Sequence, residues 1–112
     1  MVYRVEISEA AEAEAEEAYF WMLGQSPEWA ARWYRGLLAE VASLAEMPYR
    51  FPIARERERF DQEVRRMLYG EGRNKYRVLY AIVERDDPHI RVLHIRHGSR
   101  RQPEEERPDD TS

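Results

Sequence analysis

The 112-residue sequence contains no cysteine, a single lysine and no long apolar run. Without cysteine the chain can form neither disulfide bonds nor thiolate zinc sites. No stretch approaches the roughly 18 apolar residues that a membrane span needs. The start MVYRVEIS also lacks the basic, apolar and small-residue sections of a signal peptide. We therefore expect a cytoplasmic protein without membrane contact, and this length predicts one domain with a single core.

The net charge of -4 conceals an uneven distribution of charge. Residues 1–49 sum to -6, residues 50–101 to +6 and residues 102–112 to -4. An anionic partner meets the local charge rather than the sum. Of the 18 basic residues, 17 are arginine, which fits a bias toward arginine codons as well as it fits phosphate binding. The arginine content alone favours neither explanation.

The first half of the chain predicts a strand followed by two helices. Residues 2–8 alternate apolar and charged side chains, which is typical of a strand. Residues 9–23 are rich in alanine and glutamate, and residues 26–47 repeat apolar side chains at three- and four-residue spacing. Ser8 and Ser26 are expected to cap these helices, and Gly24 to end the first. The short link predicts an antiparallel hairpin, whose tryptophans and tyrosines fit a core better than a ligand platform.

The second half predicts three strands, over residues 63–69, 75–84 and 90–96. The links GEGRN and RDDPH have the glycine and Asp-Pro chemistry of turns, and they are short enough to require antiparallel neighbours. Residues 48–62, with two prolines and the run RERER, predict a solvated, charge-paired loop. The expected fold class is α+β: an N-terminal strand, a two-helix antiparallel hairpin and a three-stranded antiparallel meander. Residues 1–101 would form the domain, and residues 102–112 an acidic disordered tail.

Strand alternation sorts the side chains of the meander into two faces. The more apolar face is expected to pack against the helices and to carry Tyr76, Val78, Tyr80 and Ile82. Leu93 and Ile95 of the last strand are expected to be buried with them. The opposite face is expected to be open to a ligand and to carry Lys75, Arg77, Leu79 and Ala81. Arg66 (or Arg65) and Arg96 should share this open face, with Arg73 at a turn beside it.

Arginines on adjacent strands, about 4.8 Å apart, repel one another. Either local carboxylates such as Glu63 and Glu84 or an anion from a partner must compensate, and guanidinium groups match phosphate well. The three histidines lack the spacing of metal ligands, so no metal and no other cofactor is expected. His97, between Arg96 and Arg100, is the candidate for proton transfer.

The segment VRRMLYGEGRNKYRVLYAIVE, followed by RVLHIRHGSRR behind a strand and a helical hairpin, resembles the RelE/ParE superfamily of bacterial type II toxins. The likeness covers roughly residues 2–101, and the IRHG ending is shared with chains labelled as plasmid stabilisation proteins. It implies a helical hairpin packed on an antiparallel sheet with the N-terminal strand at its edge. It also implies a cognate antitoxin that wraps the domain into a toxin–antitoxin hetero-oligomer.

The superfamily divides by target. RelE-like members are mRNA interferases, endoribonucleases that cut mRNA on the ribosome, whereas ParE-like members poison DNA gyrase. The resemblance makes His97, Arg77 and Arg66 the candidate catalytic residues. The candidates for binding RNA phosphates are Arg65, Arg73, Lys75, Arg96 and Arg100. The arginine and histidine cluster on the meander makes mRNA cleavage the leading hypothesis. Because the segment ARERER replaces the lysine pair of RelE itself, gyrase inhibition and a purely regulatory, antitoxin-bound role are the alternatives.

Overall fold

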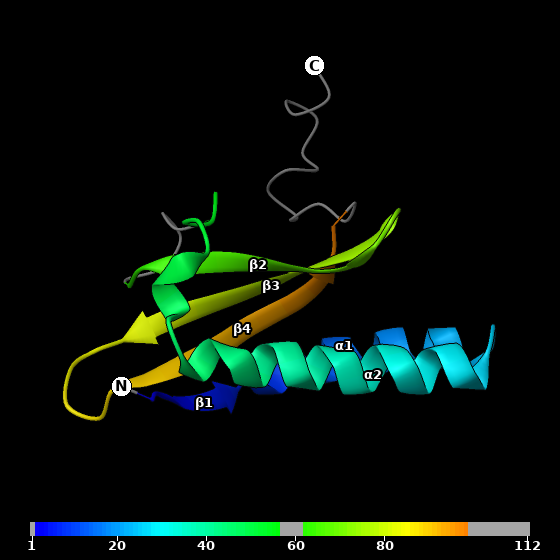
Figure 1. The fold of residues 1–112 in the computed structure, drawn as a ribbon, viewed down its shortest axis with the longest axis horizontal. Helices are drawn as coiled ribbons and strands as arrows, with labels where there is room; N and C mark the ends of the chain where they lie inside the picture. Colours follow the sequence, from blue (N-terminus) through cyan, green and yellow to red (C-terminus); the bar gives the residue numbers. More distant parts are fainter. Residues whose placement is uncertain (1, 57–61, 99–112) are drawn as a thin grey trace, which may run out of the picture.

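The structure is a computed structural model and describes residues 2–56 and 62–98. Its elements follow in the order β1 (Arg4–Ile7), α1 (Glu9–Leu23), α2 (Pro27–Ala42), the 3₁₀ helices η1 (Ser43–Ala45) and η2 (Pro48–Arg50), β2 (Val64–Glu71), β3 (Asn74–Val83) and β4 (His89–His97). This order confirms the predicted α+β fold (Figure 1). The predicted acidic tail, residues 102–112, lies outside the described residues.

The four strands form one sheet in the order β1-β4-β3-β2. The pairs β2–β3 and β3–β4 are antiparallel, as their short connections require. In contrast, β1 lies parallel to β4, from Arg4 beside His89 to Ile7 beside Val92. The N-terminal strand is therefore an edge strand, as the resemblance implied.

The helical hairpin begins and turns at the residues that the sequence indicated. The Ser8 side chain accepts a hydrogen bond from the backbone N–H of Ala11 at 3.1 Å, and Ser26 accepts one from that of Trp29 at 3.2 Å. These caps satisfy N–H groups that have no partner in the first turn of a helix. The second helix is shorter than predicted, because η1 follows directly after Ala42. In the part of the chain that the structure describes, no helix is long and apolar enough to cross a membrane.

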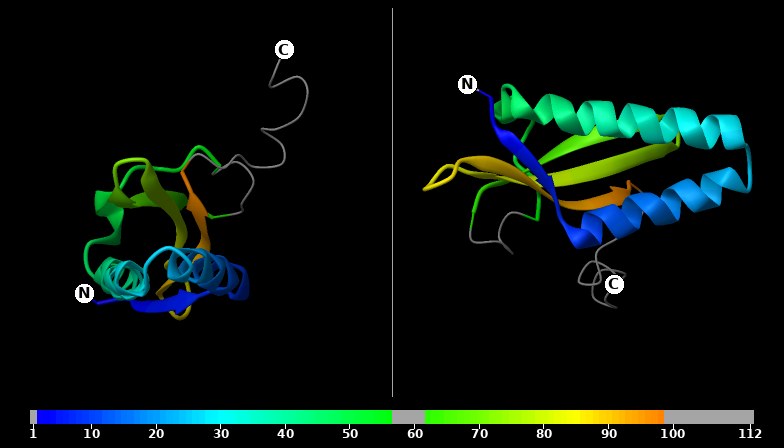
Figure 2. Two further views of the ribbon diagram at one scale, coloured as in Figure 1. Left: turned by 90° about the vertical axis from the view of Figure 1, so that its right-hand side faces the viewer. Right: turned by 90° about the horizontal axis from the view of Figure 1, so that it is seen from below.

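The core lies between the helical hairpin and one face of the sheet (Figure 2). The buried side chains of the helices are Ala11, Ala15, Ala18 and Met22 from α1, and Ala30, Trp33, Leu37 and Val41 from α2. Against them pack the four residues predicted from β3, which are Tyr76, Val78, Tyr80 and Ile82. The period-two pattern of β3 was therefore sufficient to identify the core face.

The opposite face of the sheet is covered at its centre, so the prediction of an open face was wrong. Leu79 and Ala81 are fully buried there, in a second apolar cluster with Ala54. Ala54 belongs to a segment that runs along the edge of β2, where its backbone N–H donates to the carbonyl of Val64 at 2.8 Å. The covering follows from hydrogen bonding, because an edge strand presents unpaired backbone groups that a neighbouring segment can satisfy.

A β-bulge in β4 changes which side chains point toward the helices. The pairing register shifts between Leu79, which lies opposite His94, and Tyr80, which lies opposite Val92. Leu93 is the extra residue, and it packs on the second cluster rather than on the core face. The prediction that Leu93 points inward was wrong for this reason, whereas Ile95 is buried as expected.

Candidate functional site

Three of the predicted site arginines lie on neighbouring strands and on the face of the sheet away from the helices. Arg77 on β3 lies directly opposite Arg96 on β4. Arg66 on β2 lies opposite Leu79, two residues along β3 from Arg77. Arg66 and Arg77 also line one pocket of about 450 Å³. The strand pattern therefore predicted their proximity correctly, but the charges of two of them, Arg77 and Arg96, are compensated from within the fold.

Arg77 is held by Glu56, which comes from the segment that covers this face. Its two terminal nitrogens donate to the two carboxylate oxygens of Glu56 at 2.5 and 3.0 Å. Both residues are buried, with 8 % of Arg77 and 3 % of Glu56 exposed. Burial alone would raise the pKa of Glu56, but the hydrogen bond and charge of Arg77 outweigh it and hold that pKa below its usual value.

Arg96 is held by Glu14 of α1, which reaches the edge of β4 beyond the end of β1. Glu14 accepts hydrogen bonds from Arg96 Nε at 3.1 Å, from the backbone N–H of Ile95 at 2.8 Å and from His94 Nδ1 at 3.1 Å. Burial would raise the pKa of Glu14, but these three donors lower it overall. Glu14 thus pairs with Arg96 and also links α1 to β4 through hydrogen bonds.

Arg65 lies on the same face of the sheet as Tyr80, whereas Arg66 lies on the opposite face. It forms an ion pair with Glu63 and donates to the backbone carbonyl of Phe51 at 2.5 Å. The Glu63 pairing was considered from the sequence. The other carboxylate considered, Glu84, instead accepts hydrogen bonds from Tyr3 and Tyr49.

His97 lies on the other face of the sheet from the three arginines. It is paired with Tyr76, whose ring belongs to the core, and the two ring centres are 5.1 Å apart. It lines a pocket together with Glu17 and Trp21 of α1. The structure therefore does not bring His97 together with Arg66 and Arg77, as one catalytic site would require.

The remaining predicted cations lie around the turn between β2 and β3. Arg73 and Lys75 are exposed there, and neither they nor Arg66 form a hydrogen bond or ion pair through their side chains with any described residue. Arg100 lies outside the described residues. Within residues 2–56 and 62–98, no group of three histidine, aspartate or glutamate side chains could hold a metal ion.

Sequence reasoning missed the two carboxylates that matter most here, Glu14 and Glu56. Glu14 is one of six glutamates in the first 17 residues, and nothing in that pattern distinguishes it from its neighbours. Glu56 belongs to the RERER run, whose alternation predicted solvated pairs. The only available signal was indirect, since buried or opposed arginines require nearby carboxylates.

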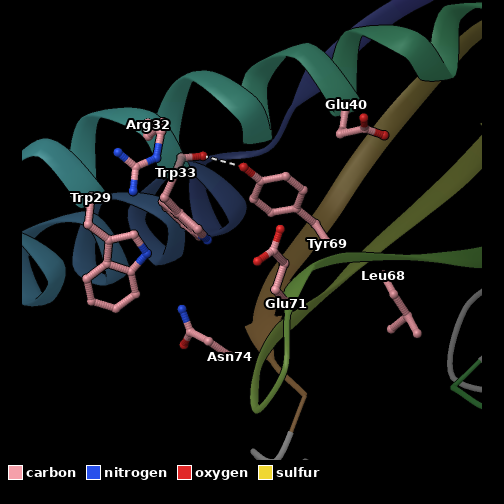
Figure 3. A pocket seen from close by; sticks show the side chains of 9 residues that line it. Trp29, Arg32, Trp33, Glu40, Leu68, Tyr69, Glu71 and Asn74 are labelled. Atoms are coloured by element: carbon pink, nitrogen blue, oxygen red, sulfur yellow. Dashed lines mark hydrogen bonds between the residues drawn. The ribbon is translucent and has the colours of Figure 1, made fainter.

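A third pocket, of about 730 Å³, lies between α2 and the β2–β3 hairpin (Figure 3). Its walls include Trp29 and Trp33 of α2 and Tyr69 of β2, whose hydroxyl donates to the backbone carbonyl of Trp33 at 2.7 Å. Gly36 makes this contact possible, because a Cβ there would stand 2.2 Å from the Tyr69 oxygen. From the sequence, these tryptophans were expected in the core rather than in a ligand platform.

A helical hairpin on one face of a four-stranded sheet, with paired arginines on the other, defines a small α+β protein of the class that the resemblance implied. A family model described as the ParE toxin of type II toxin-antitoxin system, parDE, matches residues 5–102. The chain therefore belongs to the ParE toxin family, and a cognate antitoxin is its implied partner. No curated protein matches the sequence.

Proposed function

We propose that this chain arrests growth by binding a protein target and does not cut RNA. The resemblance to ParE-like toxins implies DNA gyrase as that target. The observation that carries the proposal is the pairing of arginines with carboxylates, Arg77 with Glu56 and Arg96 with Glu14. Within the described residues, the face predicted to hold a phosphate already has two of its three guanidinium groups neutralised.

The cost of exchanging these partners supports the proposal. A phosphate could bind Arg77 only by displacing Glu56, and this would leave a carboxylate without its partner in a buried position. The proton-transfer group of a nuclease must also lie within hydrogen-bond reach of the reacting oxygen. His97, the candidate for this role, is on the opposite face of the sheet.

Ribosome-dependent mRNA cleavage is the second candidate function. It is favoured by Arg66, Arg73 and Lys75, whose side chains have no partner among the described residues. Basic side chains that are not already paired can bind phosphates, and such binding weakens as the salt concentration rises. In this alternative these three residues would carry the RNA, and His97 would require a different role.

One pair of measurements separates the two functions. Purified gyrase is assayed for supercoiling of a relaxed plasmid with increasing toxin, and mRNA 5′ ends are mapped in a translating bacterial extract with the same toxin. We expect supercoiling to be inhibited and the message to remain intact. We also expect Arg66→Ala and His97→Ala to leave inhibition within about twofold of the unchanged chain, since neither residue would perform chemistry.

New 5′ ends at ribosome-bound codons that disappear in Arg66→Ala would contradict the proposal and support mRNA cleavage. The third alternative, a regulatory partner without toxicity, is tested by strong expression in cells with and without the antitoxin. We expect growth to stop without the antitoxin and to recover with it. Normal growth in both cultures would identify the regulatory role.

A further inference from the structure

β2 is an edge strand of the sheet, and only the first part of its edge is covered. There the backbone N–H of Ala54 donates to the carbonyl of Val64 at 2.8 Å. The backbone N–H of Arg66 donates outward in the same way, to the carbonyl of Pro52 at 3.0 Å. Because backbone groups of alternate residues point to the same side of a strand, those of Leu68 also point outward. Neither forms a hydrogen bond with another described residue on that side.

Leu68 also lies between two pockets. Its side chain is 50 % exposed, and it lines both the third pocket, beside α2, and the pocket of about 450 Å³ that Arg66 and Arg77 share. Figure 3 shows Leu68 and Tyr69 on opposite sides of β2, as the alternation of a strand requires. A peptide that extended the sheet here would therefore direct successive side chains alternately toward the two pockets.

The smaller pocket, which we call the arginine pocket, combines apolar walls with positive charge. Its lining consists of Ile53, Arg55, Arg66, Leu68 and Arg77, without an acidic side chain among the described residues. Arg77 and Arg55 share the carboxylate of Glu56, at 2.5 and 3.7 Å. The side chain of Arg66, in contrast, forms no hydrogen bond or ion pair with the part of the chain that the structure describes. One guanidinium group of this pocket is therefore available to an anion.

We infer that an extended segment of a partner protein adds to the sheet at Leu68 and places an acidic side chain in the arginine pocket. The segment would lie antiparallel to β2, where one of its residues accepts from the N–H of Leu68 and donates to its carbonyl. That residue is on the same face of the sheet as Leu68 and Arg66, so its carboxylate can reach the Arg66 guanidinium diagonally. Glu56 keeps its place beside Arg77.

The unpaired backbone groups of Leu68 favour an extended peptide over other ligands. A phosphate of a nucleic acid could pair with Arg66, but it would leave these groups and the exposed side chains of Leu68 and Ile53 without partners. A helix has no free backbone groups along its side, so it cannot extend a sheet. A segment with an acidic residue between apolar ones satisfies all of these groups. Such a contact is independent of the target through which the toxin arrests growth.

The test uses the purified full-length chain labelled with ¹⁵N and the acetylated, amidated peptide Thr-Leu-Glu-Leu-Thr. The comparison probes carry glutamine in place of glutamate, or a methyl group on the backbone nitrogen of the glutamate. We expect the parent peptide to shift the Leu68 amide signal saturably. The glutamine peptide should bind about threefold more weakly, and the methylated peptide about tenfold more weakly. Equal binding of the parent and methylated peptides would overturn the proposal.

Variants of the chain locate the contact. Leu68→Pro removes an outward N–H, which edge strands tolerate, so it should weaken binding about tenfold with little change in thermal unfolding. If this variant unfolds, the methylated peptide decides the same point. Arg66→Gln should abolish the difference between the glutamate and glutamine peptides. Arg73→Gln, at an exposed arginine outside the pocket, is the control and should retain it.

Two results with these variants would contradict the inference. One is a preference for the glutamate peptide that survives in Arg66→Gln, since the acidic side chain would then lie elsewhere. The other is a six-nucleotide uridine RNA that binds more tightly than the parent peptide, equally well in Leu68→Pro, but not in Arg66→Gln. That result would assign the arginine pocket to a phosphate.

Discussion

The Glu56 carboxylate shows how one residue decides the character of a whole face. It holds Arg77 through two hydrogen bonds, and both side chains are removed from water. A buried ion pair adds little stability compared with apolar side chains of similar size, but the loss of one partner leaves a buried charge uncompensated. The Arg77 guanidinium therefore depends on Glu56 for its place in the fold.

We expect Glu56→Ala to lower the free energy of unfolding by about 3 kcal/mol, because Arg77 would lose its buried partner. The double variant Glu56→Leu with Arg77→Met should recover most of that loss, since it removes both charges and keeps the volume. Urea unfolding followed by circular dichroism measures both variants. A loss below about 1 kcal/mol in Glu56→Ala would indicate that water, rather than Glu56, satisfies Arg77.

At the scale of elements, the approach of α2 to β2 depends on one helical glycine. Glycine inside a helix normally costs about 1 kcal/mol relative to alanine. Gly36 is required here because the Tyr69 hydroxyl occupies the space where a Cβ would stand. The same hydroxyl donates to the carbonyl of Trp33, so the contact joins the helix to the hairpin.

We therefore expect Gly36→Ala to destabilise the chain by about 2 kcal/mol, as overpacking does, although the change favours helix formation. In a Tyr69→Phe background the clashing oxygen is absent, and the nearest ring carbon would be 3.3 Å from the new Cβ. There Gly36→Ala should have an effect close to zero. Thermal unfolding of the four combinations measures the coupling, and additive effects would rule out the contact.

The elements themselves were predictable from local chemistry, whereas their irregularities were not. Ser8 and Ser26 are caps that act within three residues, and the alternation of Tyr76 to Ile82 reflects burial on one side. The bulge at Leu93 and the covering of Leu79 by the segment around Ala54 depend on residues far apart in the sequence. For the candidate site, the sequence was sufficient to place Arg66, Arg77 and Arg96 on one face, but not to reveal Glu14 and Glu56 as their partners.

Glu14 and Glu56 also join separate layers of the fold. Glu14 connects α1 to β4, and Glu56 connects the covering segment to β3. Both carboxyl groups have a lowered pKa in the folded chain. Such groups contribute stability above the unfolded pKa, and that contribution is lost as the pH falls through the folded pKa.

We therefore expect the free energy of unfolding to change little between pH 7 and pH 5 and to decrease below about pH 4.3, the usual pKa of glutamate. The double variant Glu14→Gln with Glu56→Gln should be less stable at pH 7 and should show a shallower decrease in acid. Urea unfolding at a series of pH values measures both slopes. Identical slopes would show that other carboxyl groups dominate acid unfolding.

The parallel pairing of β1 with β4 has a consequence for synthesis. Within the sheet β1 pairs with β4 alone, so residues 4–7 can join the sheet only after residues 89–92 have been synthesised. Contacts between distant parts of a chain slow folding, and domains complete their folding only when all their strands are available. In a newly made chain, β1 therefore stays unpaired until β4 is available, and an antitoxin that is already present can meet the chain in that interval.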